Sequence, residues 1–333
     1  MRIAVDAFGG DNAPLEILKG AAMAEKEYGV HILLCGDKET IEKCISDNNI
    51  EFNELDIVHA SDVISMHDEP TSLLKAHKDS SMAVAFRQLA EGNADAFVSA
   101  GSTGAVVVGG TFIVKRIKGI KRPALATIIP SPDSRYMLLD CGANAECRPE
   151  MLCQFGVMAS RYLEKVEGIE NPTVGLLNIG TEETKGTELQ KEAFELMSNA
   201  DINFIGNIES RDMPGGAADI VVADGFTGNI SLKLLEGSIA TLFSMLKPVF
   251  TKNLLTKLCY LILKPELRKM KKKLNASEVG GAPLLGTRKP VFKAHGNSDA
   301  VTFKNAIGKA ILFAENNVIS AIENCFSEEV SEN

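Results

Sequence analysis

The first indication of the fold is the stretch Ile220-Val-Val-Ala-Asp-Gly-Phe-Thr-Gly-Asn229. An apolar run suited to a buried strand leads into a glycine-containing loop, and a helical pattern follows. The same order surrounds Gly101-Ser-Thr-Gly-Ala105 and Gly180-Thr-Glu-Glu-Thr-Lys-Gly186. Glycine lets the backbone come close to a ligand, and a helix N-terminus presents free N–H groups. These loops together predict a site for a compact anion, phosphate above all, at the ends of sheet strands.

Strand-like and helix-like segments alternate along nearly the whole chain. The expected strands are 2–6, 30–35, 55–59, 95–100, 124–130, 136–141, 173–179, 203–208, 219–223 and 291–295. The expected helices are 13–28, 38–47, 72–91, 103–117, 149–167, 185–198, 227–246 and 300–323. This alternation predicts an α/β fold in which a mostly parallel sheet carries helices on both faces. No repeat or linker divides the chain, so residues 1–333 are expected to form a single unit, with two intimately joined lobes as the alternative.

The composition excludes several classes of protein. The chain has 333 residues, 45% of them hydrophobic and 24% charged, as in an ordinary globular protein. Its net charge of −9 argues against nucleic acid as a partner. Its 7 cysteines have no zinc-ligand spacing, which predicts reduced thiols and no metal site. The sequence also shows no signal-peptide core and no apolar window near the ~18 residues of a membrane span, so it indicates a cytoplasmic protein.

One segment departs from the acidic average. Residues 240–274 contain nine Lys or Arg and the single acid Glu266, a net charge of +8. Apolar residues recur there at helical spacing, and Pro248 and Pro265 are expected to divide the segment into a projecting pair of amphipathic helices. One interpretation is a dimer arm or a hairpin packed on the core. The other is contact with a membrane surface or an anionic partner, through Leu254, Leu255, Leu258, Leu261 and Ile262.

Two loops near the start of the chain offer ligands for an anion. In the loop after residues 95–100, Ser102 and Thr103 can donate hydroxyls beside the backbone of Gly104, although both can equally cap a helix. Asp6-Ala-Phe-Gly-Gly-Asp-Asn12 joins the first strand to the first helix, and Asp6, Gly10 and Asn12 are candidate binding residues there. The alternative is a tight turn that only caps the helix.

The loop at residues 180–186 places a lysine before a helical pattern. An ammonium near the positive end of a helix is unfavourable unless an anion lies close by, which favours a functional Lys185. Glu182 and Glu183 could instead neutralise it locally. Asn229 lies early in another expected helix, where its amide could donate to an oxyanion, and Lys233 follows one turn later.

Four further residues are candidates for phosphate or carbonyl binding: Asn144 after one expected strand, Thr227 and Gly228 beside Asn229, and His295 after the last strand. Cys141 could be considered as an acyl-accepting nucleophile. No histidine lies in a recognisable partner motif, and the end of an aliphatic strand favours an inert buried thiol.

These residues carry a resemblance to a known family. The chain resembles the bacterial phosphate acyltransferases, the acyl-acyl-carrier-protein:phosphate transacylases of phospholipid synthesis. The matching segments, in the family's order, are 1–14, 99–105, 139–144, 180–186, 206–211, 223–229 and 293–300. Phe8, where methionine is expected, and the stretch Met213-Pro-Gly-Gly216 depart from the pattern.

The resemblance implies a fold similar to the isocitrate and isopropylmalate dehydrogenases, and a homodimer bound peripherally to the membrane through a helical hairpin. It implies that Lys185 and Asn229 are catalytic in acyl transfer from an acyl-carrier-protein thioester to inorganic phosphate, without a cofactor. The acyl phosphate would feed a membrane-embedded glycerol-3-phosphate acyltransferase. Direct attack of phosphate is the preferred mechanism.

Three alternatives remain. A dehydrogenase on the same scaffold would need an aspartate metal cluster and an adenine site, and neither is found in the sequence. A phosphotransacetylase-type enzyme would use coenzyme A. A membrane-recruited scaffold without catalysis would need only the basic segment.

Overall fold

The computed structural model describes residues 1–274 and 280–326 and contains two sheets. The first sheet has the strand order β3-β2-β1-β4-β12-β11-β5. Its strands are β1 (Arg2–Asp6), β2 (His31–Gly36), β3 (Leu55–His59), β4 (Ala96–Ser99), β5 (Ala124–Leu125), β11 (Ala282–Leu285) and β12 (Val291–Lys293). The strands from β3 to β12 pair in parallel, whereas β11 is antiparallel to both of its neighbours.

The second sheet has the order β6-β7-β10-β8-β9 and is parallel apart from the β6–β7 pair. Its strands are β6 (Thr127–Pro130), β7 (Arg135–Leu139), β8 (Thr173–Asn178), β9 (Asn203–Glu209) and β10 (Ile220–Val222). The chain therefore builds most of the first sheet, then all of the second, and returns to the first with β11 and β12.

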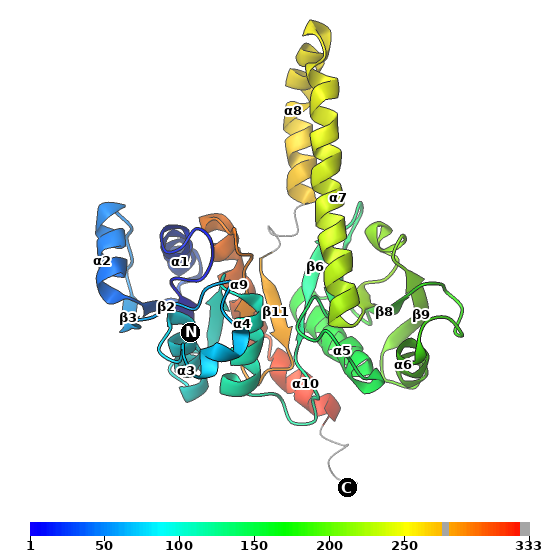
Figure 1. The fold of residues 1–333 in the computed structure, drawn as a ribbon, viewed down its shortest axis with the longest axis horizontal. Coiled ribbons are helices and arrows are strands. Elements are labelled where there is room, and N and C mark those ends of the chain that lie inside the picture. Colours follow the sequence, from blue (N-terminus) through cyan, green and yellow to red (C-terminus); the bar gives the residue numbers. More distant parts are fainter. Residues whose placement is uncertain (275–279, 327–333) are drawn as a thin grey trace.

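Helices flank both sheets (Figure 1). The helices are α1 (Leu15–Tyr28), α2 (Lys38–Asp47), α3 (Ser81–Glu91), α4 (Thr103–Gly109), α5 (Pro149–Tyr162), α6 (Glu188–Ser198), α7 (Gly225–Thr251), α8 (Leu254–Lys273), α9 (Ala300–Glu315) and α10 (Val318–Phe326). Short helical turns cover Pro70–Leu74, Gly110–Val114, Leu163–Glu167 and Met213–Gly215. In Figure 1 the first sheet with α1 to α4 lies to the left and the second with α5 and α6 to the right.

Strand β1 shows why the sheet is covered on both faces. Successive side chains of a strand point to opposite faces. Ile3 and Val5 belong to the core cluster that includes α1 and α9, whereas Ala4 belongs to the cluster that includes α3 and α4. Because residues of both sheets belong to each cluster, the apolar core is continuous across the two sheets.

The α/β prediction is confirmed, but the strands form two sheets rather than one. The expected helix 72–91 is a short turn followed by α3, because Ser80 accepts a hydrogen bond from Ala83 N (3.3 Å) and caps a new helix. The expected helix 300–323 is divided at Asn317, which has a φ of 54°. Strand β11 was not expected, because its Pro283 and the glycines before it are typical of a loop.

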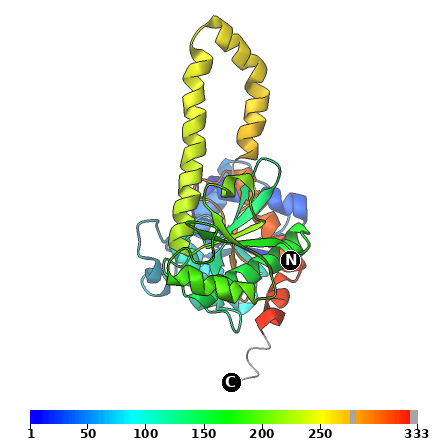
Figure 2. The same cartoon turned by 90° about the vertical axis from the view of Figure 1, so that its right-hand side faces the viewer.

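Helices α7 and α8 project from the body of the molecule (Figures 1 and 2). The division predicted at Pro248 and Pro265 was wrong in position, because α7 continues through Pro248 and α8 through Pro265. The helices meet instead at Asn253, whose Oδ1 accepts from Thr256 N (2.9 Å) as a helix cap. No helix within residues 1–274 and 280–326 is both long and apolar enough to cross a membrane.

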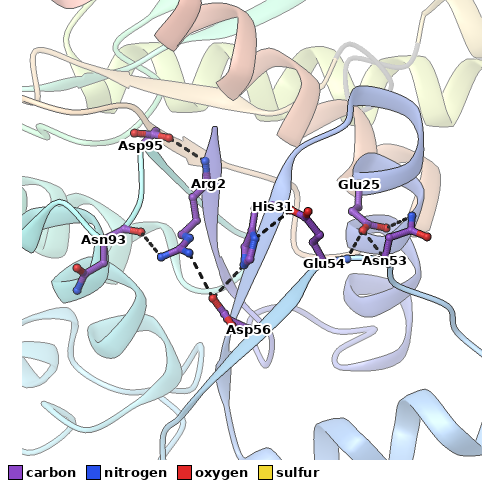
Figure 3. Close-up of polar contacts among 8 residues, drawn as sticks. All are labelled: Arg2, Glu25, His31, Asn53, Glu54, Asp56, Asn93 and Asp95. Carbon is purple, nitrogen blue, oxygen red and sulfur yellow. Dashed lines mark hydrogen bonds and ion pairs between the residues drawn. The ribbon is translucent and has the colours of Figure 1, made fainter.

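Structural polar contacts occupy the amino-terminal edge of β1 and β2 (Figure 3). Arg2 N donates to Asp95 Oδ2 (2.8 Å), and His31 Nε2 lies 3.0 Å from Asp56 Oδ2. The Glu25 carboxylate accepts from the backbone of Asn53, which ties the start of β3 to α1. These contacts fix the strands at the edge opposite to the loops that carry the candidate ligands.

Candidate active site

A cavity of about 430 Å³ lies between the two sheets, at the carboxyl ends of their strands. Thr103 follows β4, Gly142 follows β7, and His295 follows β12. Its polar and ionisable lining residues are Asp11, Thr103, Thr127, Cys141, Asn229, Lys233, Glu236, Lys293 and His295. The carboxyl ends of parallel strands are where α/β proteins bind ligands.

Asn229 is held at this cavity by the start of α7. Asp224 caps the helix by accepting from Thr227 N (2.9 Å) and Thr227 Oγ1 (2.7 Å). Gly228 lies against β7, since a β-carbon there would be 2.0 Å from the carbonyl oxygen of Asp140. The amide of Asn229 has no hydrogen-bond partner among the described residues and lines the cavity, so it can donate to a ligand.

Lys233 lines the cavity one helical turn after Asn229. Its ammonium lies 3.1 Å from the carboxylate of Glu236, which lines the cavity too. The pair leaves little net charge on this wall of the cavity.

The loop after β1 follows Asp6, a buried residue next to the site. Asp6 is buried and does not line the cavity; its carboxylate accepts from Ser81 Oγ (2.6 Å) and Ser99 Oγ (2.7 Å). Burial raises the pKa of Asp6 above its ordinary value, and these hydrogen bonds oppose the rise. Asp6 is thus placed to hold strand ends together.

Gly10 and Asn12 join this loop to the loop after β12. Gly10 has a φ of 103°, and a β-carbon there would lie 2.9 Å from the carbonyl oxygen of Gly296. The Asn12 amide donates to the carbonyls of Asn297 (3.1 Å) and Ser298 (3.2 Å). Asn12 does not cap α1, which begins at Leu15 without a side-chain cap, so the alternative of a turn that only caps the helix was wrong.

The loop after β4 contributes Thr103 directly to the cavity. Ser102 is buried beside it and makes no side-chain capping bond to α4. Gly104 lies against Pro70, where a β-carbon would be 2.5 Å from Pro70 Cγ. The loop therefore presents one hydroxyl to the cavity and packs closely behind it.

The side chain of Asn144 is used in hydrogen bonds within the protein. Its amide donates to Pro123 O and to Asp140 Oδ2, both at 2.8 Å. Its own carbonyl accepts from Gly225 N (2.8 Å), which binds the loop after β7 to the start of α7. Asn144 and Thr227 are thus adjacent to the site rather than part of the cavity wall.

Lys185 lies outside the cavity lining, on an exposed loop after β8. Helix α6 begins at Glu188, and its cap Thr187 pairs with Gln190. The expectation that Lys185 opens the helix was wrong, because the capping pair starts α6 later. No ion pair joins Lys185 to any described residue.

Two remaining candidates lie on the cavity wall. His295 is exposed, and its Nδ1 lies 3.5 Å from Asn297 N. The Cys141 thiol donates to Leu138 O (3.2 Å), and burial raises its pKa to about 12. At neutral pH Cys141 is therefore protonated and a weak nucleophile.

Sequence reasoning missed Lys293 as a functional residue. It occupies the end of β12, is only 7% exposed, and lines the cavity. The signal that could have identified it is a lysine directly after Val291-Phe292 and before Ala294, inside an otherwise apolar strand. Within the described ranges, no group of three or more His, Cys, Asp or Glu residues could hold a metal.

The fold is similar to those of solved phosphotransacylases. A phosphotransacetylase from Streptococcus pyogenes superposes with a TM-score of 0.64 at 19% identity, covering 95% of this chain and 94% of that one. A branched-chain phosphotransacylase from Enterococcus faecalis gives a TM-score of 0.59 at 17% identity, covering 94% and 99%.

Sequence similarity is much closer to another group. Residues 1–321 match the family model described as "Fatty acid synthesis protein". A phosphate acyltransferase of Alkaliphilus oremlandii is 48% identical, with 97% of this chain and 96% of the relative covered. One of Clostridioides difficile is 45% identical, with 100% and 98% covered. The chain belongs to the phosphate acyltransferase family, as its motifs predicted.

Proposed function

We propose that this chain transfers a fatty acyl group from an acyl-carrier-protein thioester to inorganic phosphate, giving acyl phosphate for phospholipid synthesis. The observation that carries the proposal is the near-full-length similarity to proteins named phosphate acyltransferase. The cavity between the sheets supports it, because Asn229, Thr103 and Lys293, which carry an amide, a hydroxyl and an ammonium, all line it.

The reaction needs no covalent intermediate on the enzyme. An oxygen of hydrogen phosphate attacks the thioester carbonyl carbon, a C–O bond forms, and the C–S bond then breaks. The proton of the hydrogen phosphate passes to the carrier thiolate, so the products are acyl phosphate and the carrier thiol. The raised pKa of Cys141 supports this direct route over an acyl-cysteine.

Asn229 and Lys185 are the proposed catalytic residues. The amide of Asn229, which lines the cavity, would donate to the oxyanion of the tetrahedral intermediate, where such a donor is typically worth ~100-fold or more in rate. Lys185, on its exposed loop and without an ion pair to the described residues, would approach the reacting anion on its flexible stem.

The other candidate residues would contribute to substrate binding in two ways. Thr103 and His295, on the cavity wall, would contact phosphate directly. The remaining residues would shape the loops around it: Asp6, Gly10, Asn12, Ser102, Gly104, Asn144, Thr227 and Gly228. Holding phosphate beside the thioester would supply most of the acceleration through proximity.

The projecting hairpin would bring the enzyme to an anionic membrane surface. Leu254, Leu255, Leu258, Leu261 and Ile262 are between 58% and 86% exposed. They lie among the basic residues of segment 240–274, and each such residue near an anionic leaflet adds about 1 kcal/mol. From this hairpin and from the family resemblance, we propose a cytoplasmic, peripherally bound homodimer that supplies a membrane-embedded glycerol-3-phosphate acyltransferase.

The test is acyl transfer with purified protein and palmitoyl-carrier protein, with and without inorganic phosphate. We expect phosphate-dependent release of carrier thiol together with acyl phosphate, trapped by hydroxylamine. Thiol release from acetyl-coenzyme A, and none from the carrier protein, would favour a phosphotransacetylase-type activity instead. No release from either donor by folded protein would favour a non-catalytic scaffold.

A further inference from the structure

Lys293 is a buried cation in the wall of the cavity. Its side chain is 7% exposed at the end of β12, in the first sheet. Its ammonium donates to the carbonyl of Ala100 (3.2 Å) at the end of β4 and to the carbonyl of Ala294. Both acceptors are neutral, so the hydrogen bonds hold the ammonium in place without compensating its charge.

The hydrogen bonds of Lys293 are incomplete. An ammonium carries three N–H donors, and two of them are used by the two carbonyls. No carboxylate of the described residues lies within ion-pair distance of Lys293 Nζ. A buried, unpaired ammonium is costly unless an anion joins it. One donor and one positive charge are therefore left for a ligand in the cavity that Lys293 lines.

The neighbouring charges do not satisfy Lys293 either. Lys233 and Glu236, from α7, pair with each other at 3.1 Å. Asp11, from the loop after β1, lines the same cavity. Asp6 lies outside the cavity lining, and its carboxylate accepts hydrogen bonds from two serine hydroxyls. Burial lowers the pKa of Lys293 to about 8; Asp11 and Asp6 oppose this fall, and Lys233 adds slightly to it. The ammonium therefore still predominates at neutral pH.

We propose that Lys293 is the phosphate anchor of this enzyme, holding the attacking phosphate at the cavity wall across from Asn229. This rests on the proposed acyl transfer to phosphate. Among the described residues that line the cavity, Lys293 is a lysine without an ion pair. It should bind a phosphate dianion more strongly than a neutral thioester carbonyl, because charge-assisted hydrogen bonds are about twice as strong as neutral ones. Thr103 and His295 lie on the same cavity and would contact the other phosphate oxygens.

The positions of Lys293 and Asn229 on different elements suit them to different tasks. Lys293 belongs to the first sheet. Asn229 belongs to α7, which follows β10, the last strand of the second sheet in chain order. Phosphate on Lys293 would therefore face a thioester carbonyl on Asn229 across the gap between the sheets. Lys185, exposed and outside the lining, is then free for a role other than anchoring phosphate.

The test is calorimetric titration of inorganic phosphate into the wild-type protein, Lys293→Met and Lys289→Met. Lys289 is the matched control, since its ammonium also donates to a backbone carbonyl, that of Leu89 (2.7 Å), but lies outside the cavity lining. We expect phosphate affinity to fall at least tenfold in Lys293→Met and to stay within twofold of wild type in Lys289→Met. Equal affinity in wild type and Lys293→Met, or no binding of phosphate to wild type, would overturn the proposal.

Steady-state kinetics separate anchoring from a general structural role. In Lys293→Met the KM for phosphate should rise at least tenfold, while the KM for palmitoyl-carrier protein stays near that of wild type. If the KM for phosphate and the KM for palmitoyl-carrier protein rose by the same factor, Lys293 would not be a specific anchor for phosphate. Wild-type protein that binds phosphate through Lys293 yet transfers no acyl group would refute the proposed function and leave the anion site standing.

If the Lys293→Met variant does not fold, the phosphate affinity of the wild-type protein at different pH values tests the same proposal. Only the protonated lysine can anchor phosphate, so affinity should fall about tenfold or more between about pH 7.5 and pH 9.5, although the dianionic fraction of phosphate grows over that range. Lys289→Met should show the same fall. A flat profile would be inconsistent with Lys293 as the anchor.

Discussion

At the scale of single residues, the close packing of Gly228 fixes where α7 starts. A β-carbon there would lie 2.0 Å from Asp140 O, so Gly228→Ala must push α7 away from β7. We expect a loss of stability of about 1–3 kcal/mol or more, as for other overpacked sites. Urea unfolding with circular dichroism measures it.

Gly237, in the same helix, is the matched control. Nothing lies within 4 Å of a β-carbon at that position. Gly237→Ala should therefore raise stability by about 0.5–1 kcal/mol, since alanine is the better helix former. Equal effects of the two substitutions would show that close packing at Gly228 does not position Asn229.

Lys185 tests whether an exposed loop residue takes part in the chemistry. Lys185→Ala should cut turnover strongly and leave stability unchanged, because the side chain is exposed and forms no ion pair with described residues. Lys191→Ala is the control: its ammonium pairs with Glu188 at 3.0 Å on the surface of α6. Near-normal turnover of Lys185→Ala would remove Lys185 from the mechanism.

Lys293 also predicts a pH dependence of stability. Its pKa is lowered to about 8 in the folded protein from 10.5, so between these values the unfolded chain binds more protons. The contribution of Lys293 to the free energy of unfolding should therefore rise with pH from about 8 to about 10.5. Urea unfolding of wild type and Lys293→Met at several pH values isolates it, and a constant difference between them would contradict the lowered pKa.

At the scale of the element, the α7–α8 hairpin links the site to the proposed membrane contact. Helix α7 leaves the second sheet at β10, lines the cavity with Asn229 and Lys233, and continues outward to Thr251. Helix α8 brings the chain back toward β11 of the first sheet (Figure 1). A long-chain product formed in the cavity would thus arise at the base of the element that bears exposed apolar residues.

The double variant Leu258→Glu, Leu261→Glu tests the membrane contact. Both side chains are exposed, so folding should be unaffected while sedimentation with anionic vesicles is lost. The control Leu196→Glu, Leu312→Glu places the same charges on exposed leucines of α6 and α9. Unchanged binding of the first variant would exclude insertion through this face and favour the dimer-arm interpretation.

The elements of the fold were largely predictable, because period-two and helical patterns are local. β1 and α2 have the expected bounds, 2–6 and 38–47. The helix caps at Ser80 and at Asn253 were missed. Each depends on a side-chain hydrogen bond to one backbone N–H, and the residues around it continue a helical pattern. The positions of the prolines were a poor guide to the ends of α7 and α8.

The site was predictable only in part. The sequence indicated loops after strands, and Thr103, Asn229 and His295 do line one cavity. It could not distinguish the Asn229 amide, which has no hydrogen bond to a described residue, from that of Asn144, which is bound to Asp140, because both are asparagines after strands. Lys293 was missed because its burial depends on packing between β4 and β12, far apart in sequence.

At the scale of the whole molecule, two sheets share one core and enclose the cavity. Leu125 N donates to Asp140 Oδ1 (3.0 Å), and Cys141 N donates to Leu125 O (2.9 Å), so the crossing between the sheets is hydrogen-bonded to the loop after β7. Because this junction forms part of the cavity wall, we propose that residues 1–333 act as a single catalytic unit.

Turnover of Asn229→Ala at saturating phosphate and palmitoyl-carrier protein tests most directly whether acyl transfer takes place in this cavity. We predict a fall of about 100-fold with stability unchanged, because the variant loses only the donor to the oxyanion. Asn48→Ala, which removes an amide bound to Cys44 O at the end of α2, should keep full turnover. Turnover of Asn229→Ala within a few-fold of wild type would contradict the placement of the chemistry between the two sheets.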